Sequence, residues 1–489
     1  MKKLLKISNL KYVAAFLLPL IFVMLINQWL DNDSWYVLAE GRHIVNNGVY
    51  YTDVLSMHEG LDATVQNYGF AVIFWLIYST FGPAGIYVGM LALNFVLCFL
   101  LYKICMLISD KNRNASLLIM VVTDCLLALS FVVTRAQMVS YVIFLGLILC
   151  LELYVKTGRV KYLLWAPLLS LLQINLHASL WWMLILAMLT YVIDSVRIPR
   201  LHLQGYRTKP LVLIWIITIL VGLVNPYGLR MITVMFTSYG DTTFKNLVTE
   251  LSSFSPLGAV WEAMVYMAIV AVLILYIFGK GSRIRIRYLL MFFGFLALGL
   301  NTVKGMSQFI LVMFFPLALM HKDVKIEEIL DAKLARNAVI FWSGIIIIGA
   351  FAASFIVVVP RVQNYPDLAI VEAIDKIDET ALESGEKLKV YSGYNDGGYI
   401  EYRGYGAYLD PRGEYFLKKN NGKEDILEEW VKFKNGKMER DEFLRKYAFD
   451  YLIVRQEDDP FYDFNNEQYE KIYENKEYST EVYRKVANE

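Results

Sequence analysis

Charged side chains are scarce in this 489-residue chain. Asp, Glu, Lys and Arg make up 19% of it, whereas hydrophobic residues make up 57%. Soluble domains carry roughly 25% charged residues and at most about 50% apolar ones, so the composition excludes an ordinary soluble protein. The formal net charge is only +1. A basic surface for nucleic acid is therefore not indicated.

Cysteine is also scarce, and its placement excludes two kinds of site. The four cysteines all lie inside apolar runs, at Cys98, Cys105, Cys125 and Cys150. The polar parts of the chain thus offer none for a disulfide framework or a cysteine-ligated metal. We interpret all four as small apolar packing residues. The histidines His43, His58 and His177 show no ligand spacing either, so a zinc site built from them is not indicated.

Apolar runs fill residues 1–360, whereas residues 361–489 are dense in Glu, Lys, Asp and Tyr. Since about 20 apolar residues span a bilayer, this shift predicts a transmembrane domain over 1–360 and a soluble α/β domain over 361–489. The fold class is an α-helical polytopic membrane protein with about eleven transmembrane helices. The candidate spans are Tyr12–Leu30, Ala84–Ile108, Ala115–Val133, Met138–Val155, Tyr162–Ile174, Ser179–Ser195, Pro210–Val224, Gly258–Phe278, Tyr288–Leu300, Phe309–Met320 and Val339–Val359.

One further apolar stretch, Tyr68–Phe81, decides the topology. Its length of about 14 residues suits an interfacial or re-entrant segment better than a span. If it does not cross, the basic loops, such as 197–209 and 280–287, all fall on one side, which the positive-inside rule makes cytoplasmic. We therefore predict a plasma-membrane protein with a cytoplasmic N-terminus and an extracytoplasmic C-terminal domain.

Residues 31–83 then form the first extracytoplasmic loop. Asp33-Ser34 is typical of a helix start and Asn47-Gly48 of a helix end. The spacing between them predicts an interfacial helix with an apolar side toward lipid and a polar side toward water or a cavity. The residues concerned are Trp35, Leu38 and Val45 on the first side, and Glu40 and His43 on the second.

Two carboxylates, Asp31 and Asp33, stand at the outer end of the first span. One interpretation makes Asp33, together with Asp31, a general base or a metal ligand. The other makes Asp33 a helix N-cap and Asp31 a solvated loop residue. Spacing alone leaves both interpretations open.

Other polar groups are predicted on the same membrane face, in short links between spans. Such groups are costly there unless they line a cavity. Arg135 and Lys304 are suited to holding a phosphate, with His177 donating to the same group. The alternative for each is a snorkelling or loop-capping role. The full set is Arg135, Gln137, Asn175, His177 and Lys304 in the links, with Gln66 and Asn67 as candidates for sugar hydroxyls.

Four short motifs carry a resemblance to a known family. They are Asp33-Ser34-Trp35-Tyr36-Val37, Arg135-Ala136-Gln137, Asn175-Leu176-His177 and Asn225-Pro226-Tyr227-Gly228. In order and placement the chain resembles GT-C-fold glycosyltransferases, in the bacterial branch related to protein mannosyltransferases and lipid A aminoarabinose transferases. The family patterns read Asp-x-Trp-Trp-His and Arg-Pro-Gln at the first two motifs. Val37 and Ala136 depart from them.

The resemblance implies transfer of a sugar from a polyprenyl-phosphate donor to an extracytoplasmic glycan, lipid or protein, with inversion. Asp33, with Asp31 beside it, would supply the base, and the seven other polar residues would bind the donor phosphate and sugar. The lack of a Gly-rich phosphate loop fits a donor that is not a nucleotide. No cofactor is required, and a divalent cation is left open. A flippase of lipid-linked glycans and a non-catalytic assembly protein of the same fold remain alternatives.

The C-terminal residues alternate between strand and helix patterns. Strands are predicted at 389–391, 407–409, 451–454, 469–473 and 480–483, and helices at 424–433 and 440–447. Two motifs, Tyr394–Tyr399 and Asp410–Gly413, have the composition of turns. They are interpreted either as turn chemistry or as part of a Tyr-rich platform for an acceptor or glycan.

Overall fold

The computed structural model describes residues 7–26, 30–196, 206–255, 260–278, 285–323, 366, 368–381, 387–456, 459–464 and 466–486. The chain divides into two compact units. The first comprises Met1–Gln28, Tyr87–Asn225 and Val248–Val362, and the second Trp29–Ile86, Pro226–Leu247 and Gln363–Glu489. The second unit therefore joins the loop after the first helix to the C-terminal residues.

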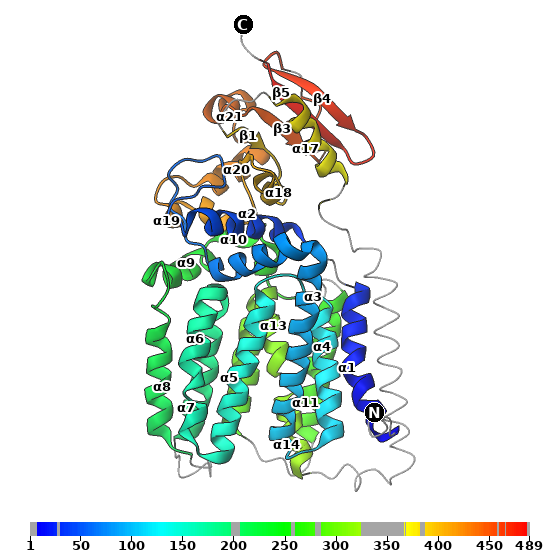
Figure 1. The fold of residues 1–489 in the computed structure, drawn as a ribbon, viewed down its shortest axis with the longest axis vertical. Coiled ribbons are helices and arrows are strands. Elements are labelled where there is room, and N and C mark those ends of the chain that lie inside the picture. The colour runs from blue at the N-terminus through cyan, green and yellow to red at the C-terminus, as the bar shows by residue number, and fades with distance from the viewer. Residues whose placement is uncertain are drawn as a thin grey trace. The chain divides into compact units, whose positions relative to one another are not determined.

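The first unit is helical throughout its described part (Figure 1). Helix α1 packs against α4, α5 against α6 and α7, α6 against α8, and α12 against both α7 and α13. The elements are α1 (Ile7–Ile26), the later part of α3 (Tyr68–Ile108), α4 (Arg113–Ala128), α5 (Gln137–Thr157), η1 (Val160–Tyr162), α6 (Trp165–Leu176), η2 (Ala178–Leu180), α7 (Trp181–Ser195), α8 (Thr208–Val221), η3 (Thr249–Leu251), α11 (Val260–Phe278), α12 (Ile286–Asn301), α13 (Val303–Val312) and α14 (Phe315–Asp323).

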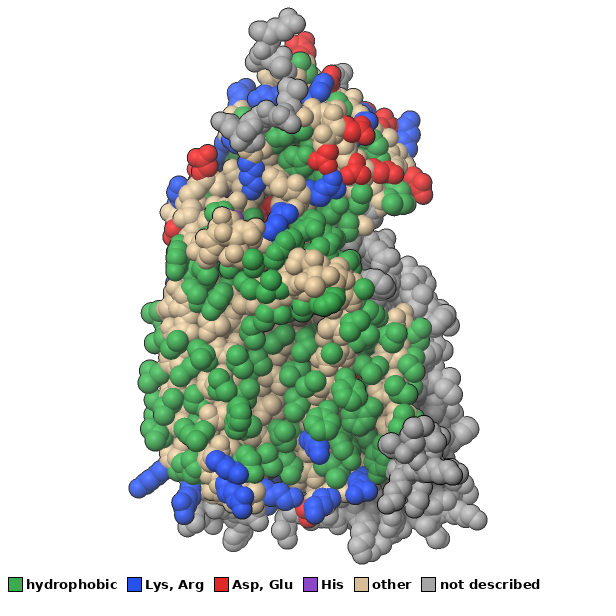
Figure 2. All heavy atoms as spheres, in the orientation of Figure 1, with side chains coloured by type: hydrophobic (Ala, Val, Ile, Leu, Met, Phe, Trp, Pro, Cys, Tyr) green, Lys and Arg blue, Asp and Glu red, His purple; other side chains and the backbone are tan. Residues whose placement is uncertain are grey.

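Three helical segments in the described residues are long and apolar enough to cross a membrane, namely Tyr68–Ile108, Gln137–Thr157 and Ala178–Ser195. Shorter apolar helices occur at Tyr12–Leu25, Val160–Leu176, Thr208–Val221, Ile286–Asn301 and Val303–Leu319. Figure 2 shows apolar side chains over the helices of this unit and Lys and Arg side chains gathered at its lower end. The number of crossings stays a prediction, and the candidate span Val339–Val359 lies outside the described residues.

The predicted span Phe309–Met320 is wrong in its bounds. Helix α13 already begins at Val303 and ends at Val312, and α14 begins at Phe315. The Thr302 side chain caps α13 by accepting from the backbone N–H of Gly305 at 3.0 Å. Lys304 therefore lies in the first turn of a helix and not in a link between spans.

Helix α3 contains a break at Gly82, where φ is 63° and ψ is −163°. A residue with a side chain rarely adopts this φ, and the following Pro83 has no N–H to continue the helix. The break falls where the sequence predicted the end of Tyr68–Phe81, so two helical segments meet there. Whether the first segment crosses a bilayer stays a prediction.

The second unit holds a five-stranded sheet in the order β2-β1-β3-β5-β4. Strands β1 and β2, and β1 and β3, pair in parallel, whereas β5 is antiparallel to both β3 and β4. Its elements are α2 (Asn32–Asn47), the first part of α3, α9 (Leu229–Tyr239), α10 (Thr242–Leu247), α17 (Leu368–Thr380), β1 (Lys389–Tyr391), α18 (Gly397–Tyr402), β2 (Gly406–Ala407), η5 (Gly413–Phe416), α19 (Lys418–Asn421), α20 (Ile426–Lys434), α21 (Arg440–Tyr447), β3 (Tyr451–Val454), β4 (Tyr469–Asn475) and β5 (Thr480–Lys485).

Helix α2 ends at Gly48 as predicted, but two expectations about it are wrong. Its N-cap is Asp31 and not Asp33, because Asp31 Oδ1 accepts from the Ser34 N–H at 3.0 Å and the Ser34 hydroxyl accepts from the Asp31 N–H. Trp35 and Leu38 are buried and do not face lipid. The Trp35 ring makes edge contacts with Tyr399 and Tyr402, because α2 packs against α18.

Candidate functional site

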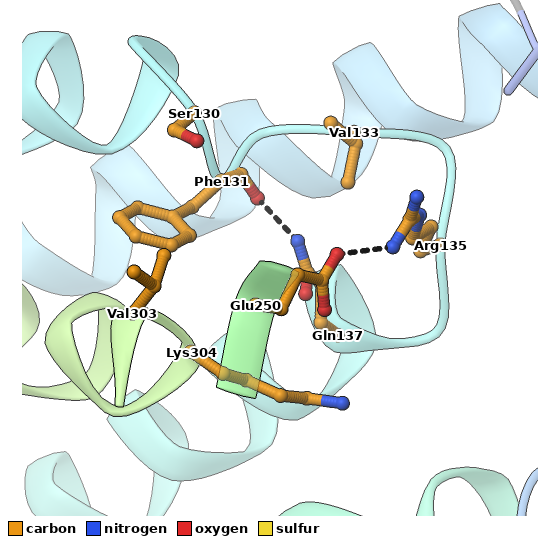
Figure 3. Close-up of a pocket in the computed structure, with 8 residues that line it drawn as sticks. All are labelled: Ser130, Phe131, Val133, Arg135, Gln137, Glu250, Val303 and Lys304. Carbon is orange, nitrogen blue, oxygen red and sulfur yellow. Dashed lines mark hydrogen bonds and ion pairs between the residues drawn. The ribbon is translucent and has the colours of Figure 1, made fainter. Parts of the chain in front are cut away.

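A small polar pocket in the first unit lies where α4 ends, α5 begins and α13 begins. It has a volume of about 80 Å³ and is lined by Ser130, Phe131, Val133, Arg135, Gln137, Glu250, Val303 and Lys304. In Figure 3 the carboxylate of Glu250 points toward Arg135, with which it forms an ion pair. Pockets that enclose a whole small-molecule ligand measure roughly 300–1,000 Å³, so this one matches a phosphate-sized group. The structure thus brings together Arg135, Gln137 and Lys304, three of the predicted residues.

Glu250 is the residue of this pocket that the sequence did not reveal. It lies in η3 and is 38% exposed. Partial burial by itself raises the pKa of a carboxyl group, but the positive charges of Arg135 and Lys304 outweigh it and hold the pKa of Glu250 below its usual range. The pocket lining therefore contains two cationic side chains and one carboxylate, so the formal charges of its lining residues sum to one positive charge.

The pocket is fixed by contacts behind its charged groups. Gln137, the first residue of α5, donates from Nε2 to the Phe131 carbonyl at 2.9 Å, which holds the link after α4 in place. Gln308 lies one turn after Lys304 on the same face of α13. Gln308 is 1% exposed, and its Oε1 has no hydrogen-bond partner within the described part of the chain. A buried acceptor of this kind is costly unless a ligand or water donates to it.

His177 is buried, and serines occupy both of its ring nitrogens. Ser140 Oγ lies 2.7 Å from Nδ1, and Ser179 Oγ lies 2.7 Å from Nε2. Ser140 Oγ also accepts from Gln173 Nε2 at 2.7 Å, so His177 belongs to a buried hydrogen-bond network. Burial and then the positive charge of Lys304 hold the pKa of His177 well below its usual range. His177 is thus a neutral group that connects α5, α6 and η2.

Acidification should destabilise the protein through His177. The neutral imidazole is favoured in the folded state, so its stabilising contribution is complete above the ordinary pKa of 6.5 and is lost as the pH falls below it. We expect the free energy of unfolding to fall by up to about 1 kcal/mol between pH 6.5 and 5.5. Thermal unfolding of the detergent-solubilised chain at both pH values, beside His177→Gln, measures it. An equal pH dependence in both proteins would contradict the assignment.

Asn175 lies in the last turn of α6, and its side chain bonds to backbone carbonyls instead of lining the pocket. Its Nδ2 donates to the carbonyls of Leu171 at 2.7 Å and Val224 at 3.0 Å. The second bond ties the end of α6 to the link after α8. Asn175 is not among the residues that line the pocket.

Asp33 lies in the first turn of α2, one residue from a contact with the C-terminal part of the second unit. Asn32 Nδ2 donates to Asn395 Oδ1 at 3.1 Å. A Cβ on Gly398 would lie 3.0 Å from the Tyr36 nitrogen and 3.4 Å from the Asn32 carbonyl oxygen. The Gly397-Gly398 pair therefore lets α18 approach the helix turn that carries Asp33. The Tyr394–Tyr399 motif serves this packing.

The negative charge of Asp33 also affects the pKa of Tyr394. Burial is the largest cause that raises the pKa of Tyr394, and the charges of Glu414 and Asp33 add to it. Gln66 Nε2 donates to Glu414 Oε1 at 3.3 Å, so Gln66 is likewise near this acidic region. The backbone carbonyl of Asn67 accepts from the Ala71 N–H at the start of α3. Asp31, Asp33, Gln66 and Asn67 all belong to the second unit.

Arg412 forms a buried ion cluster that was not foreseen from the sequence. Its guanidinium bonds Glu401 at 2.9 and 3.0 Å, Asp410 at 2.7 and 2.9 Å and Asp53 at 3.1 Å. Glu40 approaches it at 3.7 Å and accepts from the Tyr50 hydroxyl at 3.2 Å. All five charged side chains are at most 2% exposed. The cluster joins the first loop to the C-terminal segment, so turn chemistry is not the main role of Asp410–Gly413.

One arginine cannot compensate four buried carboxylates. Burial raises the pKa of Glu40 to about 8, against the opposing effects of Arg412 and Tyr50. Burial likewise raises the pKa of Glu401 well above its usual range. The pKa of Asp53 is lowered, because Arg412 and hydrogen bonds from Ser56 and Leu55 outweigh the effect of burial. The folded state thus keeps Glu40 protonated near neutral pH.

Metal ligands are not gathered anywhere in the described residues. No group of three or more His, Cys, Asp or Glu side chains there could hold a metal ion. The carboxylates of Glu401, Asp410 and Asp53 are already bonded to the Arg412 guanidinium. We therefore assign no residues to a divalent cation.

No protein-family model matches the chain, and no curated protein matches it. Solved structures do match. The crystal structure of the Archaeoglobus fulgidus oligosaccharyltransferase, tethered by a disulfide bond to an acceptor peptide with the NVT sequon, aligns with a TM-score of 0.60 at 11% identity over 91% of this chain and 69% of that one. Its apo form gives 0.59 at 11% identity with the same coverage. The chain has a membrane glycosyltransferase-like fold.

At this identity the likeness shows the fold alone, at the coarse level of the GT-C glycosyltransferases. Within this fold the structure places the predicted residues in two groups. Arg135, Gln137 and Lys304 line the pocket. The positive charge of Lys304 contributes to lowering the pKa of His177. Asp31 and Asp33 start α2 in the other unit.

Proposed function

We propose that the protein is a GT-C-type glycosyltransferase that moves a sugar from a polyprenyl-phosphate donor to an extracytoplasmic acceptor, with inversion at the anomeric carbon. The acceptor is a cell-surface glycan, a lipid or a protein. The fold of the whole chain supports the reaction class, and the Arg135–Lys304 pocket supports a phosphate at the site. The second observation carries the proposal against a non-catalytic assembly protein, which needs no such charge arrangement, whereas a flippase would bind the same phosphate and is separated by the experiment below.

The charge of the pocket fits the proposed donor. A polyprenyl-phosphate sugar is a phosphodiester with one negative charge, and the pocket holds two cations and one carboxylate. Cleavage of the glycosidic bond leaves a phosphate monoester, whose charge grows in the transition state. Arg135 offers a planar fork and Lys304 a point charge to that growing anion. Interactions that strengthen as charge develops are those that accelerate a reaction.

The donor needs no strong acid, since its phosphate is already a good leaving group. The acceptor hydroxyl does need a base, and we assign this role to Asp33, with Asp31 fixing the helix turn from which it projects. Gln308, with its unpartnered buried oxygen, is assigned to a donor hydroxyl. Gln66 and Asn67 keep their proposed role toward the sugar. His177, with both nitrogens bonded, supports the pocket rather than the phosphate.

Transfer can be separated from transport in one experiment. The purified full chain is reconstituted in liposomes with a radiolabelled polyprenyl-phosphate sugar and a membrane extract that contains acceptors. A transferase releases polyprenyl phosphate and labels the acceptor, and Arg135→Gln reduces both. Movement of intact donor between leaflets without bond cleavage would identify a flippase. An unchanged surface-glycan profile in a deletion strain would favour the assembly protein.

Glu250→Gln should strengthen donor binding. The Glu250 carboxylate is paired with Arg135, so the donor phosphate must compete with Glu250 for the guanidinium. A half-exposed ion pair is worth roughly 0–1 kcal/mol, so its removal should lower the donor Kd by up to about fivefold. Titration with the labelled donor measures the change. Weaker binding would show that Glu250 contacts the donor instead of competing with it.

A further inference from the structure

A second cavity in the first unit has a different chemistry. It measures about 690 Å³ and is lined by α1, α3, α4 and α5. Its walls are aromatic and aliphatic, formed by Tyr12, Phe99, Tyr102, Met106, Leu107, Leu149 and Leu153. Four basic side chains complete the lining at Lys103, Lys111, Arg113 and Lys156. Phe99 is 44% exposed, so the apolar wall opens at the surface of the helices.

The basic side chains outnumber the acidic groups that contact them. Lys156 lies 3.4 Å from Asp110, and both groups are about half exposed. Lys103 lies over the Phe99 ring, 5.2 Å from its centroid, so its charge sits directly above the apolar wall. Among the described residues, the four cations and the Asp110 carboxylate leave a strongly positive rim around an apolar cavity. This arrangement complements an amphiphile with an anionic head and hydrocarbon chains.

The turn between α3 and α4 holds Lys111 and its neighbour Asp110 in a strained conformation. Asp110 and Lys111 have φ values of 52° and 76°, which residues other than glycine rarely adopt. The turn is held by Ser116, whose hydroxyl donates to the Asn112 carbonyl at 2.7 Å, and by Asn112, which caps α4. Strain of this kind costs roughly 1–3 kcal/mol per residue and persists where the surroundings fix it, often at ligand sites.

The cavity lies at the opposite end of the helices from the Arg135 pocket. Helix α5 starts with Gln137 in that pocket and reaches Lys156 one residue before its end at Thr157. A helix of this length, at 1.5 Å per residue, spans about 30 Å, which equals the thickness of a bilayer's hydrocarbon core. A phosphate bound at one site cannot therefore reach the other.

We propose that this cavity binds an anionic glycerophospholipid, with its phosphate among Lys103, Lys111 and Arg113 and an acyl chain along Phe99, Leu149 and Leu153. Figure 2 shows the Lys and Arg side chains that gather at one end of the helical unit, where lipid headgroups would lie. The site is distinct from the donor site and does not depend on the proposed reaction. Its occupant would hold α3, α4 and α5 together at that end.

Native mass spectrometry of the full chain in detergent tests the proposal, with phosphatidylglycerol and phosphatidylcholine of equal chain length as probes. We expect phosphatidylglycerol to bind preferentially and Lys103→Gln/Lys111→Gln/Arg113→Gln to lower its affinity at least about tenfold, since each basic group near the headgroup contributes. The matched control is Arg159→Gln/Lys161→Gln/Lys209→Gln, which removes the same charge from exposed positions outside the cavity. The control should retain wild-type affinity.

Three results would overturn the proposal. The first is equal binding of the two lipids by the wild-type chain. The second is an equal loss in both triple variants, which would indicate general charge attraction. The third is displacement of phosphatidylglycerol by polyprenyl phosphate at lower concentration, or by millimolar inorganic phosphate, which would identify another occupant. Preserved helical circular dichroism in both triple variants shows that they are folded.

Discussion

Asp33→Asn is expected to lower sugar transfer by about 10²–10⁴-fold, the usual contribution of a positioned general base. The amide keeps the size of the side chain but cannot take a proton from the acceptor hydroxyl. Donor binding should stay within about twofold, because the phosphate is assigned to Arg135 and Lys304. Initial rates of label transfer at saturating donor, together with donor titration, separate the two effects.

The matched control for this prediction is the neighbouring carboxylate. Asp31 caps α2 through the Ser34 N–H, and asparagine caps a helix about as well as aspartate. Asp31→Asn should therefore retain most of the activity while removing the same charge two residues away. Full transfer by Asp33→Asn, or an equal loss in both variants, would end the assignment of Asp33 as the base.

Arg412→Met is expected to cost about 3–5 kcal/mol of stability, because it leaves buried carboxylates without a counter-charge. The four affected groups are at most 1% exposed, so water cannot take over the role of the guanidinium. The expected readout is a large drop in the Tm of the purified chain. If the variant does not accumulate, Arg412→Met/Glu401→Gln/Asp410→Asn, which also removes two of the carboxylates, should recover folded protein. Failure of this rescue would contradict the electrostatic explanation.

Glu40→Gln should stabilise the chain at pH 7, because the pKa of about 8 keeps Glu40 protonated in the folded state while the unfolded carboxyl is ionised. A raised pKa means that the stabilising contribution of Glu40 is complete below the ordinary value of 4.5 and is lost as the pH rises through about 8. The Tm of the wild-type chain should thus fall relative to that of Glu40→Gln as the pH rises from about 5 to about 8, and the difference should level off above about pH 8. Parallel pH profiles of the two proteins would show that Glu40 is already charged at neutral pH.

Local pattern determined most of the C-terminal elements. The predicted helix at 440–447 is α21, the strands at 389–391 and 451–454 are β1 and β3, and 469–473 and 480–483 fall within β4 and β5. The strand at 407–409 is shorter than predicted, because β2 ends at Ala407. Strand β3 is a short continuous apolar run and β4 mixes apolar and polar residues within a few positions, and such patterns are set by the segment itself.

The apolar runs by themselves likewise placed the described helices of the first unit and the break at Gly82. Only the tertiary structure decided which polar residues meet. Glu250 joined Arg135 across 115 residues, and Arg412 gathered Glu40 and Asp53 across more than 350. Such pairs leave no periodic trace, since a charge in a loop looks the same whether it is solvated or buried against a distant partner. The hydrophobic periodicity of a segment determines its secondary structure locally. The pairing of buried charges, in contrast, depends on contacts that exist only once the chain has folded.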